Sequence, residues 1–209
     1  QCLSKKGGGA EKMLIWLANA LHNKNYEIHL YSWDNYSAKT FYHYNQKIKW
    51  HRLKKDDEKV SKFEKFIRLF KNLRKNKIQI IIGFVMSGDG TLYLASLLNS
   101  VKIISAERNE PAMYNIIYNK LRKKINFFLL GFSKTIVLQQ KEFIEFYPKS
   151  LLNKIKVIEN PVFSNFHNKK FKFSEKIKTK NILYVGRLER IQKRPMILLE
   201  SFNLISQKI

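Results

Sequence analysis

The sequence has few residues that crosslink or bend a chain: one cysteine and four prolines occur in 209 residues. The single cysteine, Cys2, excludes an internal disulfide and suits a reducing compartment. Long hydrophobic runs are also missing, because residues 78–86 and 127–132 are far shorter than the roughly 20 residues of a spanning helix. Residues 1–6 lack the apolar core of a signal peptide. We therefore expect a cytoplasmic protein, either soluble or peripheral on the inner face of the cytoplasmic membrane.

Acidic residues are scarce: 16 of them face 40 lysines and arginines, and the formal net charge is +24. This balance favours anionic partners such as nucleic acid, anionic lipid headgroups or phosphorylated small molecules. The alternative is drift toward lysine, since solvated lysines cost a fold little. No nucleic-acid-binding signature occurs, so we expect no specific nucleic acid partner. The five histidines lack metal-ligand spacing, and we expect neither a metal nor a cofactor.

Short β-rich runs alternate with helical stretches, a pattern typical of a parallel α/β sheet. The expected strands are 27–33, 47–53, 78–85, 101–106, 134–138 and 154–158. The expected helices are 11–23, 57–77, 89–99, one from Pro111 to about residue 130, and one ending near Pro148. The continuous apolar run 78–85 indicates a central strand that is covered on both faces.

The chain is expected to contain parts of two domains. We predict a Rossmann-like domain over 1–162, with its first strand missing or truncated, then a linker over 163–180 and the start of a second domain over 181–209. In the last segment, a strand and the helix after Pro195 form one βα unit, too small to bury its own apolar face. The expected fold class is α/β: a Rossmann-like parallel sheet flanked by helices, plus one βα unit of a truncated second domain.

Two segments have the composition of phosphate-binding loops. Gly7 to Glu11 leads directly into a helix, where glycines allow close approach and unpaired N–H groups favour an anion. A tight turn between strand and helix is the alternative. Farther along, Gly186 ends an expected strand, and Arg187 and Lys193 follow in the loop before the next helix. That pair of cations suits a diphosphate, with a solvated basic loop as the alternative.

Several motifs occur in the order seen in one family of enzymes. They are Gly8 to Glu11, Leu17 to Leu21, Glu27 to Leu30, Ile104 to Pro111, Val157 to Val162, Asn181 to Leu188, and Lys193. In this order they resemble the retaining group 1 glycosyltransferases of family 4, which have the GT-B fold. The resemblance spans nearly the whole chain, which would then be the N-terminal half of a GT-B fold plus the start of the second domain.

The resemblance implies a metal-independent, retaining glycosyltransferase. It would move a sugar from a nucleotide-diphospho-sugar, such as a UDP-sugar, to a saccharide or lipid-linked saccharide in glycan or polysaccharide biosynthesis. Arg187 and Lys193 would act as catalytic residues by neutralising the donor diphosphate. Gly8 and Gly9 would allow the first domain to close on the same phosphates. The acceptor would bind mainly to the first domain.

Two departures from the family pattern affect these expectations. The Glu-x7-Glu motif that holds the donor is absent from the 209 residues, so we expect this chain alone to be inactive. Many members have histidine where this chain has Arg108. Glu107, Arg108 and Asn109 are therefore acceptor-side candidates, with a purely structural pairing of Glu107 and Arg108 as the alternative.

The expected helix 57–77 combines an apolar stripe with many cations. Its candidate membrane-facing residues are Lys62, Lys65, Arg68 and Lys71. A basic helix with a phenylalanine-rich face can lie in an anionic membrane interface, whereas an ordinary amphipathic helix packs that stripe on the sheet. Two other functions remain as alternatives to the transferase. One is a non-catalytic sugar-nucleotide or membrane-binding remnant of the fold, and the other is a basic nucleic-acid-binding protein.

Overall fold

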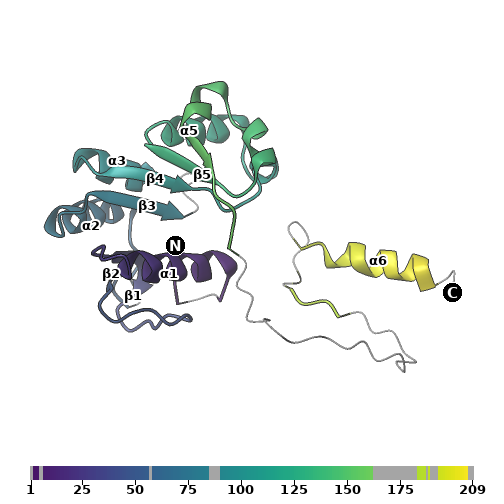
Figure 1. Ribbon diagram of the computed structural model, residues 1–209, viewed down its shortest axis with the longest axis horizontal. Coiled ribbons are helices and arrows are strands. Elements are labelled where there is room, and N and C mark those ends of the chain that lie inside the picture. Colours follow the sequence, from purple (N-terminus) through teal and green to yellow (C-terminus); the bar gives the residue numbers. More distant parts are fainter. Residues whose placement is uncertain are drawn as a thin grey trace. The chain divides into compact units, whose positions relative to one another are not determined.

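The computed structural model describes residues 2–4, 7–56, 58–84, 90–161, 183–186, 188 and 193–206 (Figure 1). The chain divides into two units, Gln1–Val162 and Phe163–Ile209. The first unit contains every described strand, and the second contains one described helix, α6 (Pro195–Ser206). No helix among these residues is both long enough and apolar enough to span a bilayer.

The first unit is an α/β structure in which all described strand pairs are parallel. Its strands are β1 (His29–Asn35), β2 (Lys49–Lys54), β3 (Ile80–Phe84), β4 (Lys102–Ala106), β5 (Thr135–Leu138) and β6 (Ile155–Val157). They form a two-stranded sheet, β1-β2, and a four-stranded sheet in the order β3-β4-β5-β6. This parallel, helix-flanked arrangement confirms the Rossmann-like α/β class.

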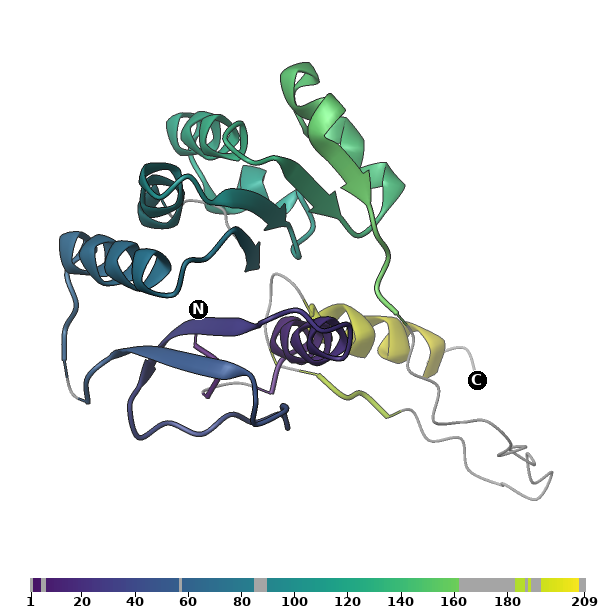
Figure 2. The same ribbon diagram turned by 60° about the vertical axis from the view of Figure 1, so that its left-hand side comes forward.

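Helices cover these sheets as right-handed crossovers require. The main ones are α1 (Gly9–His22), α2 (Lys62–Lys75), α3 (Gly90–Leu98), α4 (Met113–Ile117) and α5 (Lys120–Leu130). The connections β3-α3-β4 and β4-α5-β5 run in the same direction across the sheet, so α3 and α5 lie on one face, alongside α2 (Figure 2). Helix α1 packs on β1, where Ile15 and Ala18 share a buried cluster with Leu30.

Helix α2 joins the two sheets. Its buried Leu69 and Leu73 pack in one cluster with Leu53 of β2 and with the partly buried Tyr31 of β1 and Ile81 of β3. Leu73 is only 1% exposed. Burying a leucine of this kind contributes roughly 1.5–3 kcal/mol, so this one helix face fixes how the two sheets meet.

The sequence placed the start of α2 too early, at residue 57 instead of Lys62. Ser61 caps the helix: its hydroxyl accepts a hydrogen bond from the Glu64 N–H at 3.2 Å, and Glu64 accepts one from the Ser61 N–H at 2.9 Å. This reciprocal capping box satisfies two backbone donors and sets the first turn. The motif Ser-x-x-Glu was present in the sequence and would have corrected the prediction.

The expected helix from Pro111 to residue 130 is also wrong, because it is two helices. Tyr118 adopts an extended conformation, with φ −117° and ψ 138°, and separates α4 from α5. The Asn119 side chain then accepts a hydrogen bond from the Arg122 N–H at 2.8 Å and caps α5. Asparagine is favoured at this position because its side-chain oxygen accepts a hydrogen bond from a first-turn backbone N–H, which has no partner within the helix.

Two further expectations about secondary structure fail. The helix expected to end near Pro148 is a pair of 3-10 segments, η1 (Lys141–Phe146) and η2 (Lys149–Lys154), on either side of that proline. Leu183–Val185 is not a strand, while residues 181 and 182 of that prediction lie outside the described residues. A strand forms only with a hydrogen-bonded neighbour, and none pairs with these three residues in the described part of the chain.

Strand β3 differs from the central strand that its sequence suggested. Among the described residues it pairs with β4 alone, and Ile80 is 52% exposed. Strand β1 likewise pairs only with β2 within that part of the chain. A continuous apolar run shows that a strand suits burial on both faces, but it does not report how many neighbours the strand has. The expected linker at 163–180 lies outside the described residues.

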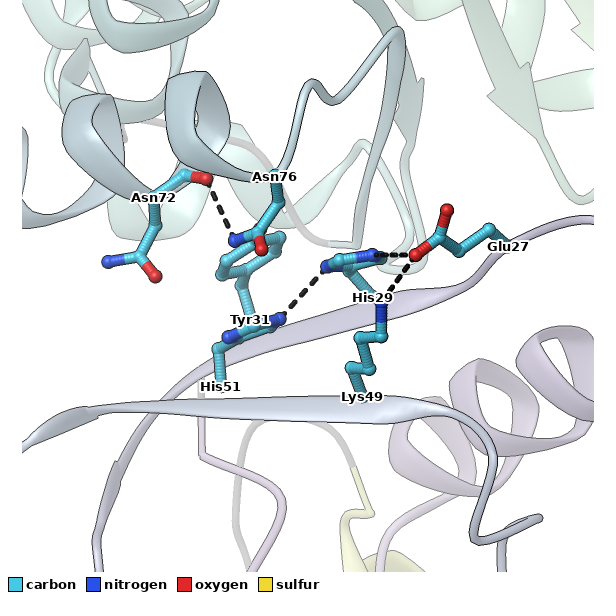
Figure 3. Close-up of polar contacts among 7 residues, drawn as sticks. All are labelled: Glu27, His29, Tyr31, Lys49, His51, Asn72 and Asn76. Carbon is cyan, nitrogen blue, oxygen red and sulfur yellow. Dashed lines mark hydrogen bonds and ion pairs between the residues drawn. The ribbon is translucent and has the colours of Figure 1, made fainter.

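A cluster of stacked rings and polar contacts covers β1 and β2 on the side facing α2 (Figure 3). His29 Nδ1 lies 2.9 Å from His51 Nε2, and the two rings stack with centroids 5.0 Å apart. His29 Nε2 also lies 3.1 Å from a carboxylate oxygen of Glu27, which binds Lys49 at 2.5 Å. Figure 3 shows that His29, Tyr31 and His51 come from adjacent positions on the two strands.

This cluster is connected to α2 through a tyrosine. Asn76, which caps the end of α2, donates a hydrogen bond to Tyr31 Oη at 3.0 Å. Burial raises the pKa of Tyr31 to about 12. Burial also lowers the pKa of His51, and the nearby positive charges of His29, Lys49 and Lys75 lower it further. A neutral His51 is therefore part of the folded arrangement.

The stability of the protein should consequently fall as the pH drops through the ordinary histidine range. The pKa of His51 is depressed in the folded state, so near pH ~6.5 the unfolded chain binds more protons there. The stabilisation is present above that range and is lost as the pH falls. We expect His51→Gln to flatten the decline in unfolding free energy between neutral and mildly acidic pH, measured by urea denaturation. The exposed His43→Gln is the matched control, and an equal flattening in both variants would contradict this assignment.

Candidate functional site

Polar residues gather where the strands of the larger sheet end. Glu107, Arg108 and Asn109 follow β4, Gln139 follows β5, and Asn160 follows β6. The carboxyl ends of parallel strands lie at one edge, which is where ligands bind in open α/β sheets. The structure therefore brings the acceptor-side candidates together with two residues that the sequence did not single out.

Arg108 is positioned by three elements. Its guanidinium donates a hydrogen bond to the side-chain oxygen of Asn160, and its Cζ lies 5.4 Å from the centre of the Phe84 ring. Gln139 donates to the backbone carbonyl of Arg108 at 3.4 Å. Phe84 and Asn160 thus hold the side chain between the ends of β3 and β6, while Gln139, after β5, holds the backbone. Among the described contacts, the hydrogen-bond partner of its guanidinium is therefore Asn160 and not Glu107.

The guanidinium of Arg108 remains cationic although it is half-buried. Burial lowers its pKa, yet the ordinary pKa of arginine is so high that the group keeps its charge at neutral pH. Its Nε is buried and has no hydrogen-bond partner among the described residues. A half-buried guanidinium is suited to bind a carboxylate, a phosphate or sugar hydroxyls through its accessible edge.

Glu107 lies deeper than Arg108 and is 2% exposed. Its backbone N–H donates to the carbonyl of Val137 at 3.0 Å, which continues the β4–β5 ladder by one residue. The hydroxyl of Tyr147 is buried nearby, and its pKa is raised first by burial and then by the charges of Glu107 and Tyr93. Because it is buried in this way, Glu107 is suited to a structural role at the carboxyl edge.

A buried chain of hydroxyl groups lies beneath the same edge. Tyr93 Oη is 3.0 Å from Ser105 Oγ, which is 2.7 Å from Ser133 Oγ. All three residues are at most 1% exposed, so these hydroxyls satisfy one another inside the core. The chain fixes α3 and the loop before β5 to β4. A serine in the apolar run of β4 was the sequence signal that could have identified it.

The amino-terminal glycines lie at the start of α1. Gly8 is the N-cap, and its carbonyl accepts a hydrogen bond from Tyr42 Oη at 3.3 Å. A Cβ on Gly8 would collide with the Glu11 carboxylate, and one on Gly7 would come within 2.8 Å of the Phe41 ring. Gly9 has open space around its Cα. These neighbours are the ends of side chains, so the surroundings of Gly8 and Gly9 leave the backbone at the start of α1 open to a ligand.

The remaining candidates have separate surroundings. Arg187 lies outside the described residues, and Lys193 is in a turn before α6 in the second unit. On α2, Arg68 is bound by both carboxylate oxygens of Glu58, and this contact lowers the pKa of Glu58 to about 2. Lys65 Nζ lies 5.5 Å from the Trp33 ring centre. The other two candidates, Lys62 and Lys71, are exposed.

The residues that the structure describes do not meet the requirements of a metal site. Among the described residues, no group of three or more His, Cys, Asp and Glu side chains could hold a metal ion. The cluster of His29, His51 and Glu27 is a set of hydrogen bonds and stacked rings. The polar groups that the structure describes at the carboxyl edge include the Arg108 guanidinium and the side-chain amides of Gln139 and Asn160.

Comparison with known proteins agrees with the arrangement of this sheet. The family described as glycosyl transferase 4-like matches residues 6–128, more than half of the chain. A similar protein from Campylobacter jejuni is 27% identical over 217 residues, which cover 97% of this chain and 55% of the relative. The chain thus spans about half the length of that curated relative.

The name of that relative gives both its activity and its acceptor. It is a GalNAc-alpha-(1->4)-GalNAc-alpha-(1->3)-diNAcBac-PP-undecaprenol alpha-1,4-N-acetyl-D-galactosaminyltransferase. Its similarity to the present chain extends beyond the segment matched by the family, through the carboxyl edge and into the second unit. With the parallel Rossmann-like sheet and the family match over most of the first unit, the chain belongs to the glycosyl transferase 4-like family.

Proposed function

We propose that the complete protein transfers a sugar from a nucleotide-diphospho-sugar to a lipid-linked saccharide. The observation that carries this proposal is the cationic, half-buried Arg108 at the carboxyl edge of a sheet in a glycosyltransferase family. The relative's acceptor, a saccharide on PP-undecaprenol, supports the lipid-linked class. A UDP-sugar is the donor that we propose, with retention at the anomeric carbon and without a metal.

The carboxyl edge would bind the acceptor. Arg108 supplies a half-buried guanidinium, and the neighbouring Asn109 and Gln139 add amide groups that suit sugar hydroxyls. Glu107 would support the edge, because its side chain is buried. Since Phe84 and Asn160 orient the guanidinium before any ligand arrives, binding would cost little side-chain entropy.

The donor diphosphate would bind to Arg187 and Lys193, with Gly8 and Gly9 on the side of the first domain. Two cations close together in the chain can neutralise the charge that develops on the leaving diphosphate. In this proposal, residues 181–209 begin the donor-binding domain and residues 1–162 form the acceptor-side domain. The 209-residue chain alone would be inactive, because the Glu-x7-Glu segment lies outside it.

The enzyme would work beside the inner face of the cytoplasmic membrane. Lys62 and Lys71 are the exposed members of the basic set on α2, and they would lie toward anionic headgroups. A non-catalytic sugar-nucleotide or membrane-binding remnant of the same fold is the second candidate. Sugar transfer by the complete protein separates the two.

Replacing Arg108 by alanine in the complete protein should lower kcat/KM for the acceptor by about 10- to 100-fold. Loss of a hydrogen bond to a charged group costs roughly 1.5–3 kcal/mol, which corresponds to that range. The measurement is a transfer assay with a radiolabelled nucleotide sugar and varied lipid-linked saccharide. Arg108→Lys should recover part of the rate. Arg74→Ala removes an exposed arginine from α2 and is the matched control; equal activity in all three variants would exclude the acceptor role.

Replacing Arg187 or Lys193 by alanine should instead reduce turnover in a donor-dependent manner. Each variant loses positive charge beside the leaving diphosphate, so we expect about 10²-fold lower kcat with little change in the acceptor KM. Calorimetry with the nucleotide sugar measures donor binding separately from turnover. Lys141→Ala, on the exposed surface of η1, serves as the control. Unchanged turnover and donor affinity in both variants would defeat the assignment of these two cations.

A further inference from the structure

Helix α5 carries a stripe of large apolar side chains on its outer surface. Leu121 and Phe128 are each 68% exposed, Ile125 is 48% exposed, and Phe132, just beyond the helix, is 42% exposed. Their spacing of four, three and four residues places them on one side of a helix with 3.6 residues per turn. Exposed leucines occur singly on most proteins, but four aligned residues form a continuous surface.

The opposite side of α5 already contacts the core. Asn126 and Leu130 are buried, and Phe127 packs against the cluster that contains Ile136 of β5 and Tyr147. Leu129 packs beside Tyr93 of α3. The helix therefore has one apolar side that secures it to the sheet and a second that faces away from it, which the first unit does not need for folding.

Cations border the exposed stripe. Lys120, Arg122 and Lys124 are exposed beside it, and α5 contains no acidic residue. These cations occupy the first turns of the helix, where the helix dipole makes positive charge unfavourable. Helix stability consequently does not explain their position. An exposed apolar stripe between cations is the pattern of a helix that lies in a membrane interface.

Helix α2 shows the contrasting arrangement. Its stripe, which includes Leu69 and Leu73, is buried between the two sheets, and Phe63 at its first turn is the strongly exposed member. Of the two alternatives that the sequence left open for this helix, the apolar stripe thus packs in the core. On α3, Leu94 and Leu98 are also exposed.

We propose that α5 docks on an anionic lipid bilayer, with Leu121, Ile125, Phe128 and Phe132 inserted among the headgroups. Charge complementarity favours this occupant, because Lys120, Arg122 and Lys124 would face the negative surface potential of the membrane. A second copy of the chain would bring the same cations together around the stripe. Phosphates of a nucleic acid would satisfy the cations but leave the apolar residues exposed to water.

This docking surface concerns where the protein resides and goes beyond the proposed transfer reaction. Vesicle binding can therefore fail while sugar transfer succeeds, or the reverse. The apolar stripe supplies insertion, and the cations supply attraction that weakens as salt screens it. Both contributions are measurable on the protein without substrate.

The test is co-sedimentation with vesicles of phosphatidylglycerol and phosphatidylcholine in equal parts, compared with phosphatidylcholine alone. Ile125→Asn with Phe128→Asn should weaken partitioning to the anionic vesicles at least about tenfold, because two apolar side chains that would be buried in the bilayer are lost. Arg122→Gln with Lys124→Gln should weaken it roughly 25-fold, about fivefold for each cation. Phe41→Asn, an equally exposed phenylalanine in the loop before β2, is the matched control and should bind like the parent.

A second readout does not depend on loss of binding. Phe128→Trp should show a blue-shifted fluorescence maximum with anionic vesicles and no shift with phosphatidylcholine alone. Unchanged partitioning of the Ile125→Asn and Phe128→Asn double variant would overturn the proposal. So would a parent protein that forms a dimer in sedimentation, loses it in the double variant and ignores vesicles, because the stripe would then bind a second copy.

Discussion

The packing of α2 against both sheets is the constraint on which the rest of the first unit depends. Strands β1 and β2 have no hydrogen bonds to the four-stranded sheet among the described strand pairs, so side-chain burial connects the two. Leu69 and Leu73 supply most of that connection, together with the tyrosine that α2 holds through Asn76. His51, whose pKa is lowered by burial, belongs to the same joint, because its ring stacks on that tyrosine.

Once the joint is fixed, the larger sheet can present a stable carboxyl edge. The hydroxyl chain from Tyr93 to Ser133 ties α3 and the β5 loop to β4, and Arg108 extends over the ends of the strands above it. Packing against the sheets also determines which apolar sides of the helices remain exposed. Helix α2 buries its apolar side within the core, whereas α5 keeps an apolar stripe exposed between cations.

Periodicity and motif order sufficed to predict the α/β class, most strands and the position of Glu107 to Asn109 after β4. They failed to predict the helix starts that local hydrogen bonds determine, at the Ser61 and Asn119 caps, although both cap residues can be read in the sequence. They also could not show that Asn160 binds Arg108, since these residues lie 52 positions apart and meet only through the sheet. Likewise, α2 and α5 are both basic and apolar, and only burial distinguishes the side that packs from the side that remains exposed.

The central claim is that the carboxyl edge of the sheet binds the saccharide acceptor. It is tested most directly by placing a photo-crosslinking amino acid at Asn109 of the complete protein and irradiating it with a lipid-linked saccharide. The matched position is Gln79, which is exposed at the amino end of β3 on the opposite edge. We predict a crosslink to the saccharide from position 109 and none from position 79. Equal labelling at both positions, or labelling at 79 alone, would contradict the account.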